Sequence, residues 1–158
     1  GSVHALTDVW FAQGAQTALT TDAAGLNTLK LVSSDQSLDL GAVGTGKLLG
    51  VHVIDLSGAG TNTLTLAAQD VIDMSGMNLF NSASTTAVSG AALAASIAKH
   101  QVAIYGDALD TAHIGAADWT NTGTVVNYNS HDLVVYNSNT SAAQLYIEQA
   151  MVTVSHVL

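Results

Sequence analysis

The stretch "SGAGTNTLTL", residues 57–66, joins a glycine-containing turn to a short run of β-forming residues. The same layout occurs 35 residues earlier in "DAAGLNTLK", residues 22–30. The two copies share a glycine, an asparagine and a leucine at matched positions: Gly25 and Gly60, Asn27 and Asn62, Leu29 and Leu64. A repeated unit of turn and strand predicts a solenoid-like, all-β fold in which successive copies bury one another's apolar faces.

The length of one coil has two interpretations. If the 35-residue offset is a full coil, Leu29 stacks on Leu64 in neighbouring strands and Asn27 lies near Asn62. The alternative is a coil of 16 to 18 residues, the spacing of three triplets that alternate apolar, acidic and apolar residues as half-buried strands do. These triplets are Leu38-Asp39-Leu40, Ile54-Asp55-Leu56 and Ile72-Asp73-Met74, and the shorter coil places their three acids in one column.

Both repeated turns are similar to a calcium-binding nonapeptide, G-G-x-G-x-D-x-U-x, in which U is a large apolar residue. Asn27 and Asn62 stand where that pattern has its aspartate. Asparagine keeps an oxygen but lacks the charge that dominates Ca²⁺ affinity, and it favours turns through its own hydrogen bonds. The stretches are either calcium turns or corners without a metal, and the preferred interpretation is a degenerate repeat turn, a corner that keeps the geometry of the calcium repeat without the metal.

The other segments extend a single domain over residues 1–158. Residues 1–20 are expected to be an N-terminal strand or linker, and residues 20–75 the solenoid-like repeats. Residues 76–101 combine a loop rich in Ser, Thr and Asn with a short helix at 91–100, where Ala and Leu dominate. Residues 102–158 return to strands, with a β-hairpin at 123–138 turning at Asn-Ser-His-Asp and one or two further strands at 142–155.

Composition excludes several classes of function. The chain has 158 residues, of which 48% are hydrophobic and only 5% aromatic, so an aliphatic core is expected. Its net charge of -9 disfavours nucleic acids and anionic membranes, because both bind clustered Lys and Arg. Membrane insertion is not expected, since no run of 18 apolar residues occurs, and the absence of cysteine excludes thiol chemistry.

Several phrases in the chain resemble a module of very large RTX-type bacterial surface adhesins that leave the cell by type I secretion. These phrases are "IDLSGAGTNTLTLAAQDVIDMSG", "AKHQVAIYGDALDT", "WTNTGTV" and "AAQLYIEQAMVTV", and the resemblance covers the chain from about residue 26 to its end. It implies an extracellular location at the bacterial cell surface, a role in adhesion or biofilms, and calcium in the surroundings. The acidic, cysteine-free composition is compatible with export as an unfolded chain that calcium then helps to fold.

The calcium candidates are Asp107 and Asp110, which lie close together on one predicted turn. Family members often carry G-D-A-G-D where this chain has G-D-A-L-D at 106–110, so Leu109 departs from the family pattern. The alternative is that both are ordinary loop acids and that the Asp107 side chain caps the turn.

A carbohydrate-binding module is the alternative function. Asp118 precedes Trp119, and a Trp ring stacks on sugar faces while an Asp binds hydroxyl groups, although Trp119 filling the core is the more common outcome. A polysaccharide-acting enzyme is the third hypothesis and is disfavoured, because Glu148 is the single glutamate and no paired acids are evident. With no G-x-S-x-G or H-E-x-x-H motif, no catalytic residue is assigned.

The expected partners are neighbouring modules of the same large protein or other copies of it. The final segment, "QLYIEQAMVTVSHVL", is rich in β-formers and carries one acid, so it is a candidate edge strand. Its apolar face is either core or contact surface, and consists of Leu145, Ile147, Val152 and Val154.

Overall fold

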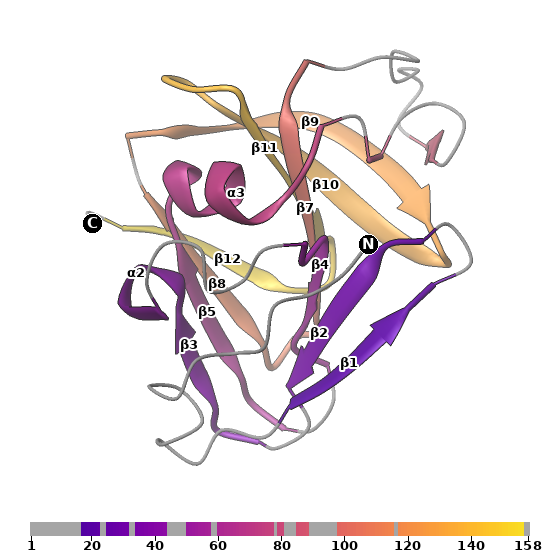
Figure 1. The fold of residues 1–158 in the computed structure, drawn as a ribbon, viewed down its shortest axis with the longest axis vertical. Coiled ribbons are helices and arrows are strands. Elements are labelled where there is room, and N and C mark those ends of the chain that lie inside the picture. Colours follow the sequence, from indigo (N-terminus) through magenta and orange to yellow (C-terminus); the bar gives the residue numbers. More distant parts are fainter. Residues whose placement is uncertain are drawn as a thin grey trace.

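The computed structural model describes residues 17–22, 25–31, 34–43, 50–57, 60–77, 79–80, 85–88, 98–115 and 117–156 (Figure 1). These residues are mostly β-strand, with two short helices, α2 (Leu40–Val43) and α3 (Ala68–Met74). The predicted all-β class is therefore confirmed. Within the described part of the chain, no helix is long and apolar enough to cross a membrane.

Sheet A has eight strands in the order β1-β2-β4-β7-β11-β10-β9-β6. Its four central strands, β2 (Asn27–Leu31), β4 (Val53–Asp55), β7 (His100–Tyr105) and β11 (Ala143–Glu148), run parallel to one another. The flanking strands pair antiparallel, and they are β1 (Thr17–Thr21), β10 (His131–Ser138), β9 (Trp119–Tyr128) and β6 (Thr86–Ala87).

Sheet B has four strands in the order β12-β8-β5-β3, and all of them run parallel. They are β3 (Ser37–Asp39), β5 (Thr63–Leu66), β8 (Thr111–Gly115) and β12 (Val152–His156). Along the chain, each parallel strand of sheet A is followed by one strand of sheet B. The chain therefore passes from sheet A to sheet B four times (Figure 1).

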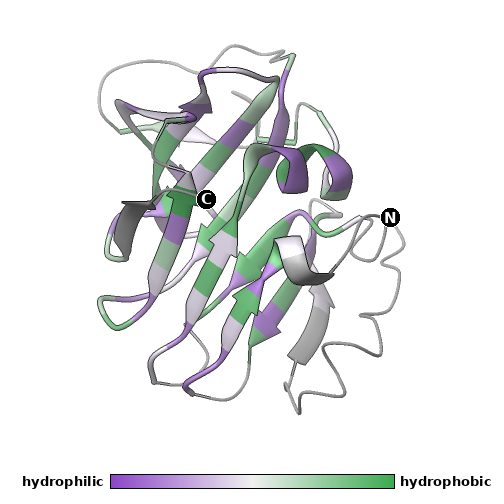
Figure 2. Cartoon of the chain, turned by 90° about the vertical axis from the view of Figure 1, so that its left-hand side faces the viewer, coloured by the Kyte–Doolittle hydropathy of each residue, from purple (hydrophilic) through white to green (hydrophobic). Residues whose placement is uncertain are grey.

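Alternation along the strands builds the main core between the two sheets. On sheet A the register aligns Leu29, Ile54, Ile104 and Ile147, each at most 1% exposed. On sheet B it aligns Leu38, Leu64 and Ala112, all fully buried. Figure 2 shows hydrophobic and hydrophilic residues alternating along these strands, as expected where one strand face meets the core.

A second core contains residues of β4, β7, β11, β10 and β9 of sheet A, together with Leu26 and Phe80. The Phe80 ring contacts Tyr128 and Tyr146, each with centroids 5.0 Å apart. The backbone of Phe80 is held by the buried side chain of Gln101, because Gln101 Oε1 accepts the Phe80 N–H at 2.8 Å. Gln101 Nε2 also donates to Gln144 Oε1 at 2.8 Å, so the amide group is not left unpaired in the core.

Both predicted coil lengths are wrong. Leu29 lies in β2 of sheet A and pairs with Ile54, whereas Leu64 lies in β5 of sheet B and pairs with Leu38. The aligned residues are 25 positions apart in sheet A and 26 in sheet B. The 35-residue similarity arises because one kind of turn precedes a strand of each sheet, so the two copies are alike locally but are not stacked.

The three acidic triplets also fail to form one column. Asp39 ends β3, Asp55 ends β4, and Asp73 lies in helix α3. The segment 68–74 is helical because Ala68, Val71 and Met74 place apolar side chains three residues apart on its buried face. Asp70 secures the start of this helix, since its Oδ2 accepts the Ala67 N–H at 2.7 Å.

The predicted C-terminal hairpin is confirmed, because β9 and β10 pair antiparallel across Tyr128 and His131. Asn129 and Ser130 form its two-residue turn with φ of 51° and 69°, as a type I′ turn requires. The segment 142–155 forms two strands, β11 and β12. Of the helix predicted at 91–100, residues 91–97 lie outside the described residues, and His100 begins β7.

Candidate functional site

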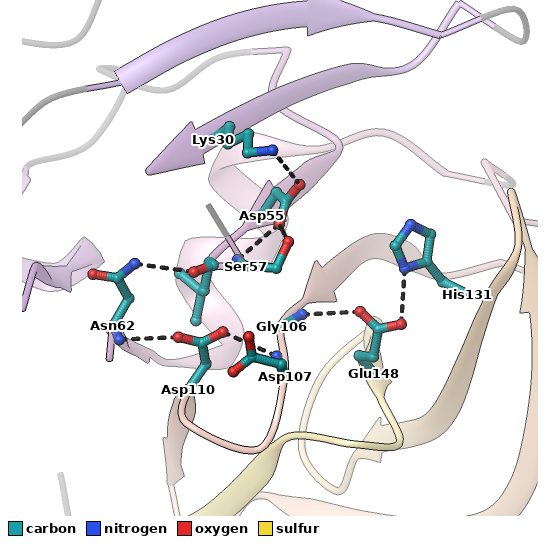
Figure 3. Close-up of polar contacts among 10 residues, drawn as sticks. Lys30, Asp55, Ser57, Asn62, Gly106, Asp107, Asp110, His131 and Glu148 are labelled. Carbon is teal, nitrogen blue, oxygen red and sulfur yellow. Dashed lines mark hydrogen bonds and ion pairs between the residues drawn. The ribbon is translucent and has the colours of Figure 1, made fainter. Parts of the chain in front are cut away.

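Three of the predicted site residues, Asn62, Asp107 and Asp110, lie at the corners between the two sheets, where one polar residue precedes each of β3, β5 and β8. We call these residues, Gln36, Asn62 and Asp110, the corner row, of which Figure 3 shows Asn62 and Asp110. The Gln36 N–H donates to Asn62 Oδ1 at 2.8 Å, and the Asn62 N–H donates to Asp110 Oδ1 at 2.9 Å. Side chains of the corner row thus accept the backbone N–H of the neighbouring corner, and they connect three successive corners.

The two asparagines of the repeated turns share several local features. Gly25 and Gly60 both take a positive φ two residues before the asparagine, and both asparagines are buried. Asn62 Nδ2 donates to the Leu56 carbonyl at 3.0 Å, and Asn27 Nδ2 donates to the Gly50 carbonyl at 2.9 Å. These contacts are with the protein backbone, which favours the interpretation of both turns as corners.

Asp110 is fully buried, and each of its oxygens accepts one backbone N–H. The donors are Asn62 and Asp107, both at 2.9 Å. Burial raises the pKa of the Asp110 carboxyl, against the two N–H donors, which lower it. A Ca²⁺ ion at this turn would have to compete with both backbone donors for the Asp110 oxygens.

Asp107 is exposed and its Oδ1 accepts the Leu109 N–H at 2.9 Å, so its side chain caps the turn as the alternative interpretation expects. Leu109 is 59% exposed and does not take a positive φ, so this turn accommodates a leucine. Among the described residues, no three or more histidine, aspartate or glutamate side chains are grouped so as to hold a metal ion.

Trp119 and Asp118, the predicted sugar-binding pair, lie at the start of β9. Trp119 is only 8% exposed and belongs to the main core, so it offers no open face to a sugar ring. Its Nε1 is buried without a hydrogen-bond partner. Asp118 Oδ1 accepts the hydroxyls of Ser138 at 2.9 Å and Thr140 at 2.6 Å, and thereby fixes the loop between β10 and β11.

A further polar cluster, centred on Glu148, was not predicted from the sequence. Glu148 Oε1 accepts the Gly106 N–H at 3.0 Å, and its Oε2 contacts His131 Nδ1 at 2.8 Å (Figure 3). The Tyr105 ring stacks on the His131 imidazole, with centroids 3.7 Å apart. Burial first, then the charges of Asp22, Glu148 and Asp55, raise the pKa of Tyr105.

An imidazole oriented by a carboxylate occurs in acid–base sites and in metal sites. Here the contact ties the β9-β10 turn to the ends of β7 and β11, which is a structural role. No local sequence signal predicts the cluster, because its residues are up to 43 positions apart in the chain. They become neighbours only through the sheet register.

No family model, curated protein or solved structure matches this chain. The described residues place the protein in the all-β class, with parallel strand ladders.

Proposed function

We propose that this chain is a structural and interaction module of a secreted bacterial surface or biofilm adhesin. The observation that carries the proposal is the corner row, in which Asn62 and Asp110, both considered as calcium ligands, instead each accept a backbone N–H group of a neighbouring corner. Polar groups used in this way stabilise a scaffold. The proposal assigns no catalytic residue and no enzymatic activity.

The scaffold is proposed to be β-solenoid-like, with one strand of sheet A and one strand of sheet B in each coil. The first two coils repeat every 25 or 26 residues, as the pairs Leu29–Ile54 and Leu38–Leu64 indicate. Later coils are longer because the segment before β7 and the β9-β10 hairpin are inserted between parallel strands. In stacked folds of this kind each repeat contacts its neighbours, and this arrangement is compatible with a module that is joined to others in a long chain.

The extracellular location rests on the sequence. The resemblance to RTX-type adhesins, the net charge of -9 and the absence of cysteine all favour a protein exported by type I secretion and exposed to calcium. Calcium stabilisation is part of the proposal, with the exposed carboxylate of Asp107 as the accessible ligand of the predicted pair. The carbohydrate-binding alternative relied on Trp119, whose burial removes its main support.

The proposed partners are neighbouring modules or other copies of the protein. Within the described residues, β3 and β12 are the outermost strands of sheet B, so each has one side not paired with another described strand. Such strand edges accept a further strand through backbone hydrogen bonds.

The location is tested by labelling intact cells of the source bacterium with an antibody raised against this chain. We expect labelling of intact cells or of the extracellular matrix, and a control antibody against a cytoplasmic protein should label only permeabilised cells. Detection of the chain only after permeabilisation would contradict the proposal.

A further inference from the structure

His52 makes an unusual contact at the junction between the first two parallel strands of sheet A. Its Nδ1 lies 2.9 Å from the backbone nitrogen of Asn27, which begins β2. The backbone N–H of His52 donates to the Asn27 carbonyl at 3.0 Å. The imidazole therefore accepts the Asn27 N–H and extends the short β2–β4 pairing, which has three register pairs, by one further contact.

The hydrogen-bond partner determines the protonation state of this ring. A backbone N–H can only donate, so Nδ1 of His52 must be unprotonated, and the ring must be neutral. Two other histidines have the opposite arrangement, because His100 Nδ1 faces the Ser75 carbonyl and His131 Nδ1 faces the Glu148 carboxylate. Those two contacts need a proton on Nδ1, whereas the His52 contact needs Nδ1 without a proton.

The charges around His52 favour a change of position when it is protonated. Burial lowers the pKa of His52, and Asp22 in the β1-β2 turn raises it. The backbone of His52 is hydrogen-bonded to Asn27 of β2 on one side and to Ala103 of β7 on the other. Ala103 and its neighbour Val102 carry no charge. Asp22 accepts the Leu26 N–H at 2.9 Å and the Tyr128 hydroxyl at 2.5 Å. Because the pKa of Tyr128 is raised, mainly by burial, this phenol stays neutral and leaves Asp22 as the acidic group of the β1-β2 turn.

We propose that His52 is a proton-operated latch that holds the β1-β2 hairpin onto the parallel ladder of sheet A. In the neutral state its Nδ1 anchors Asn27, and Asn27 in turn accepts the Thr21 hydroxyl at 2.8 Å across the hairpin. Protonation places two N–H groups face to face, so the anchor is lost and the imidazolium is drawn towards Asp22. The hairpin then loosens from β4, and the parallel edge of β4 becomes accessible.

The direction of the pH dependence follows from the lowered pKa. A base whose pKa is lower in the folded than in the unfolded state stabilises the fold fully above the unfolded value, 6.5, and loses that contribution as the pH falls through the folded value. The latch therefore opens on acidification below about pH 6.5.

Amide hydrogen exchange measured by NMR tests the latch. We expect the protection factor of the Asn27 amide to fall roughly fivefold between pH 7.5 and the acid side of the His52 titration, because about 1 kcal/mol of hydrogen bonding is lost. In His52→Gln, whose side-chain oxygen accepts without titrating, the protection factor of Asn27 should be independent of pH. In His113→Gln, a matched change on β8, the fivefold fall should remain.

Two results would overturn the latch. One is an Asn27 protection factor that stays constant while the imidazole signals of His52 titrate. The other is an equal fall in wild type and His52→Gln. If the variant does not fold, the ¹⁵N shifts of His52 in the wild type decide, because a protonated Nδ1 at pH 7.5 contradicts the proposed contact.

Discussion

Single residues at special backbone positions carry much of the local organisation. Gly25 and Gly60 turn the chain with positive φ before buried asparagines. A β-carbon at Gly60 would approach Ser34 Cβ to 2.5 Å, so close approach of two corners requires glycine there. Asp35, Asn129 and Ser130 take positive φ with a side chain present, which costs free energy that glycine would not incur.

Replacing Ser130 with glycine should raise the free energy of unfolding by about 0.5–1 kcal/mol. Ser130 has φ of 69° at the second position of the type I′ turn, where glycine is favoured after asparagine. Chemical denaturation measures the effect. Ser130→Ala is the matched control, because it removes the hydroxyl without relieving the backbone, and equal stabilities of the two variants would contradict the explanation.

At the scale of elements, the corners decide how sheet A is joined to sheet B. Asp110 contributes two acceptors to this junction, and Asp107 contributes one at an exposed position. Gly106 leaves space for the next corner, since a β-carbon there would lie 2.5 Å from Met151 Sδ. The turn at 106–110 is therefore packed against its neighbours on both sides.

Asp110→Ala should lower the free energy of unfolding by about 3 kcal/mol, because two buried backbone N–H groups lose their acceptor. Asp107→Ala, the matched control, should cost under about 1 kcal/mol, since the Leu109 N–H it leaves can bond to water. Urea denaturation of both variants provides the measurement. Similar losses for the two would mean that Asp110 has no special part in joining the corners.

At the scale of the whole molecule, the net charge of -9 destabilises the compact state through repulsion among the acids. We expect millimolar Ca²⁺ to raise the melting temperature by about 2–4 °C for each kcal/mol of binding energy, and to do so more than Mg²⁺, because Ca²⁺ accepts irregular oxygen ligands. The shift should shrink in Asp107→Ala if this carboxylate is a ligand. Identical melting curves with Ca²⁺ and with a chelator would show that packing alone stabilises the domain.

The C-terminal segment combines a core strand and an outer strand. Leu145 and Ile147 of β11 are buried between β7 and β10, so for these two residues the core interpretation is correct. β12 pairs with β8 and is an outermost described strand of sheet B.

We therefore expect self-association to involve β12. Light scattering after size exclusion should detect dimers or larger species at high concentration for the wild type, and fewer for Val154→Lys, because a lysine on an edge strand discourages pairing with another chain. A wild type that remains monomeric at every concentration would contradict this expectation.

The sequence by itself determined the properties that depend on neighbouring residues: the all-β class, the two glycine turns, the β9-β10 hairpin and the aliphatic residues of the main core. Alternating polarity and turn-forming residues act over a few positions, so they can be read directly. The helix at 68–74 was missed because the triplet Ile72-Asp73-Met74 fits a strand as well as a helix, and packing of Ala68, Val71 and Met74 decided between them.

Only the tertiary structure decided the spacing between paired parallel strands, the burial of Trp119, the partners of Asp110, and the contacts of His52 and Glu148. Each depends on which distant strands become neighbours, and one turn motif serves both sheets equally well. Parallel pairing joins residues 25 or more positions apart, as Leu29 and Ile54 are joined, and local sequence preferences do not determine that register. The register is set by the simultaneous burial of all the apolar columns, which is a property of the folded chain as a whole.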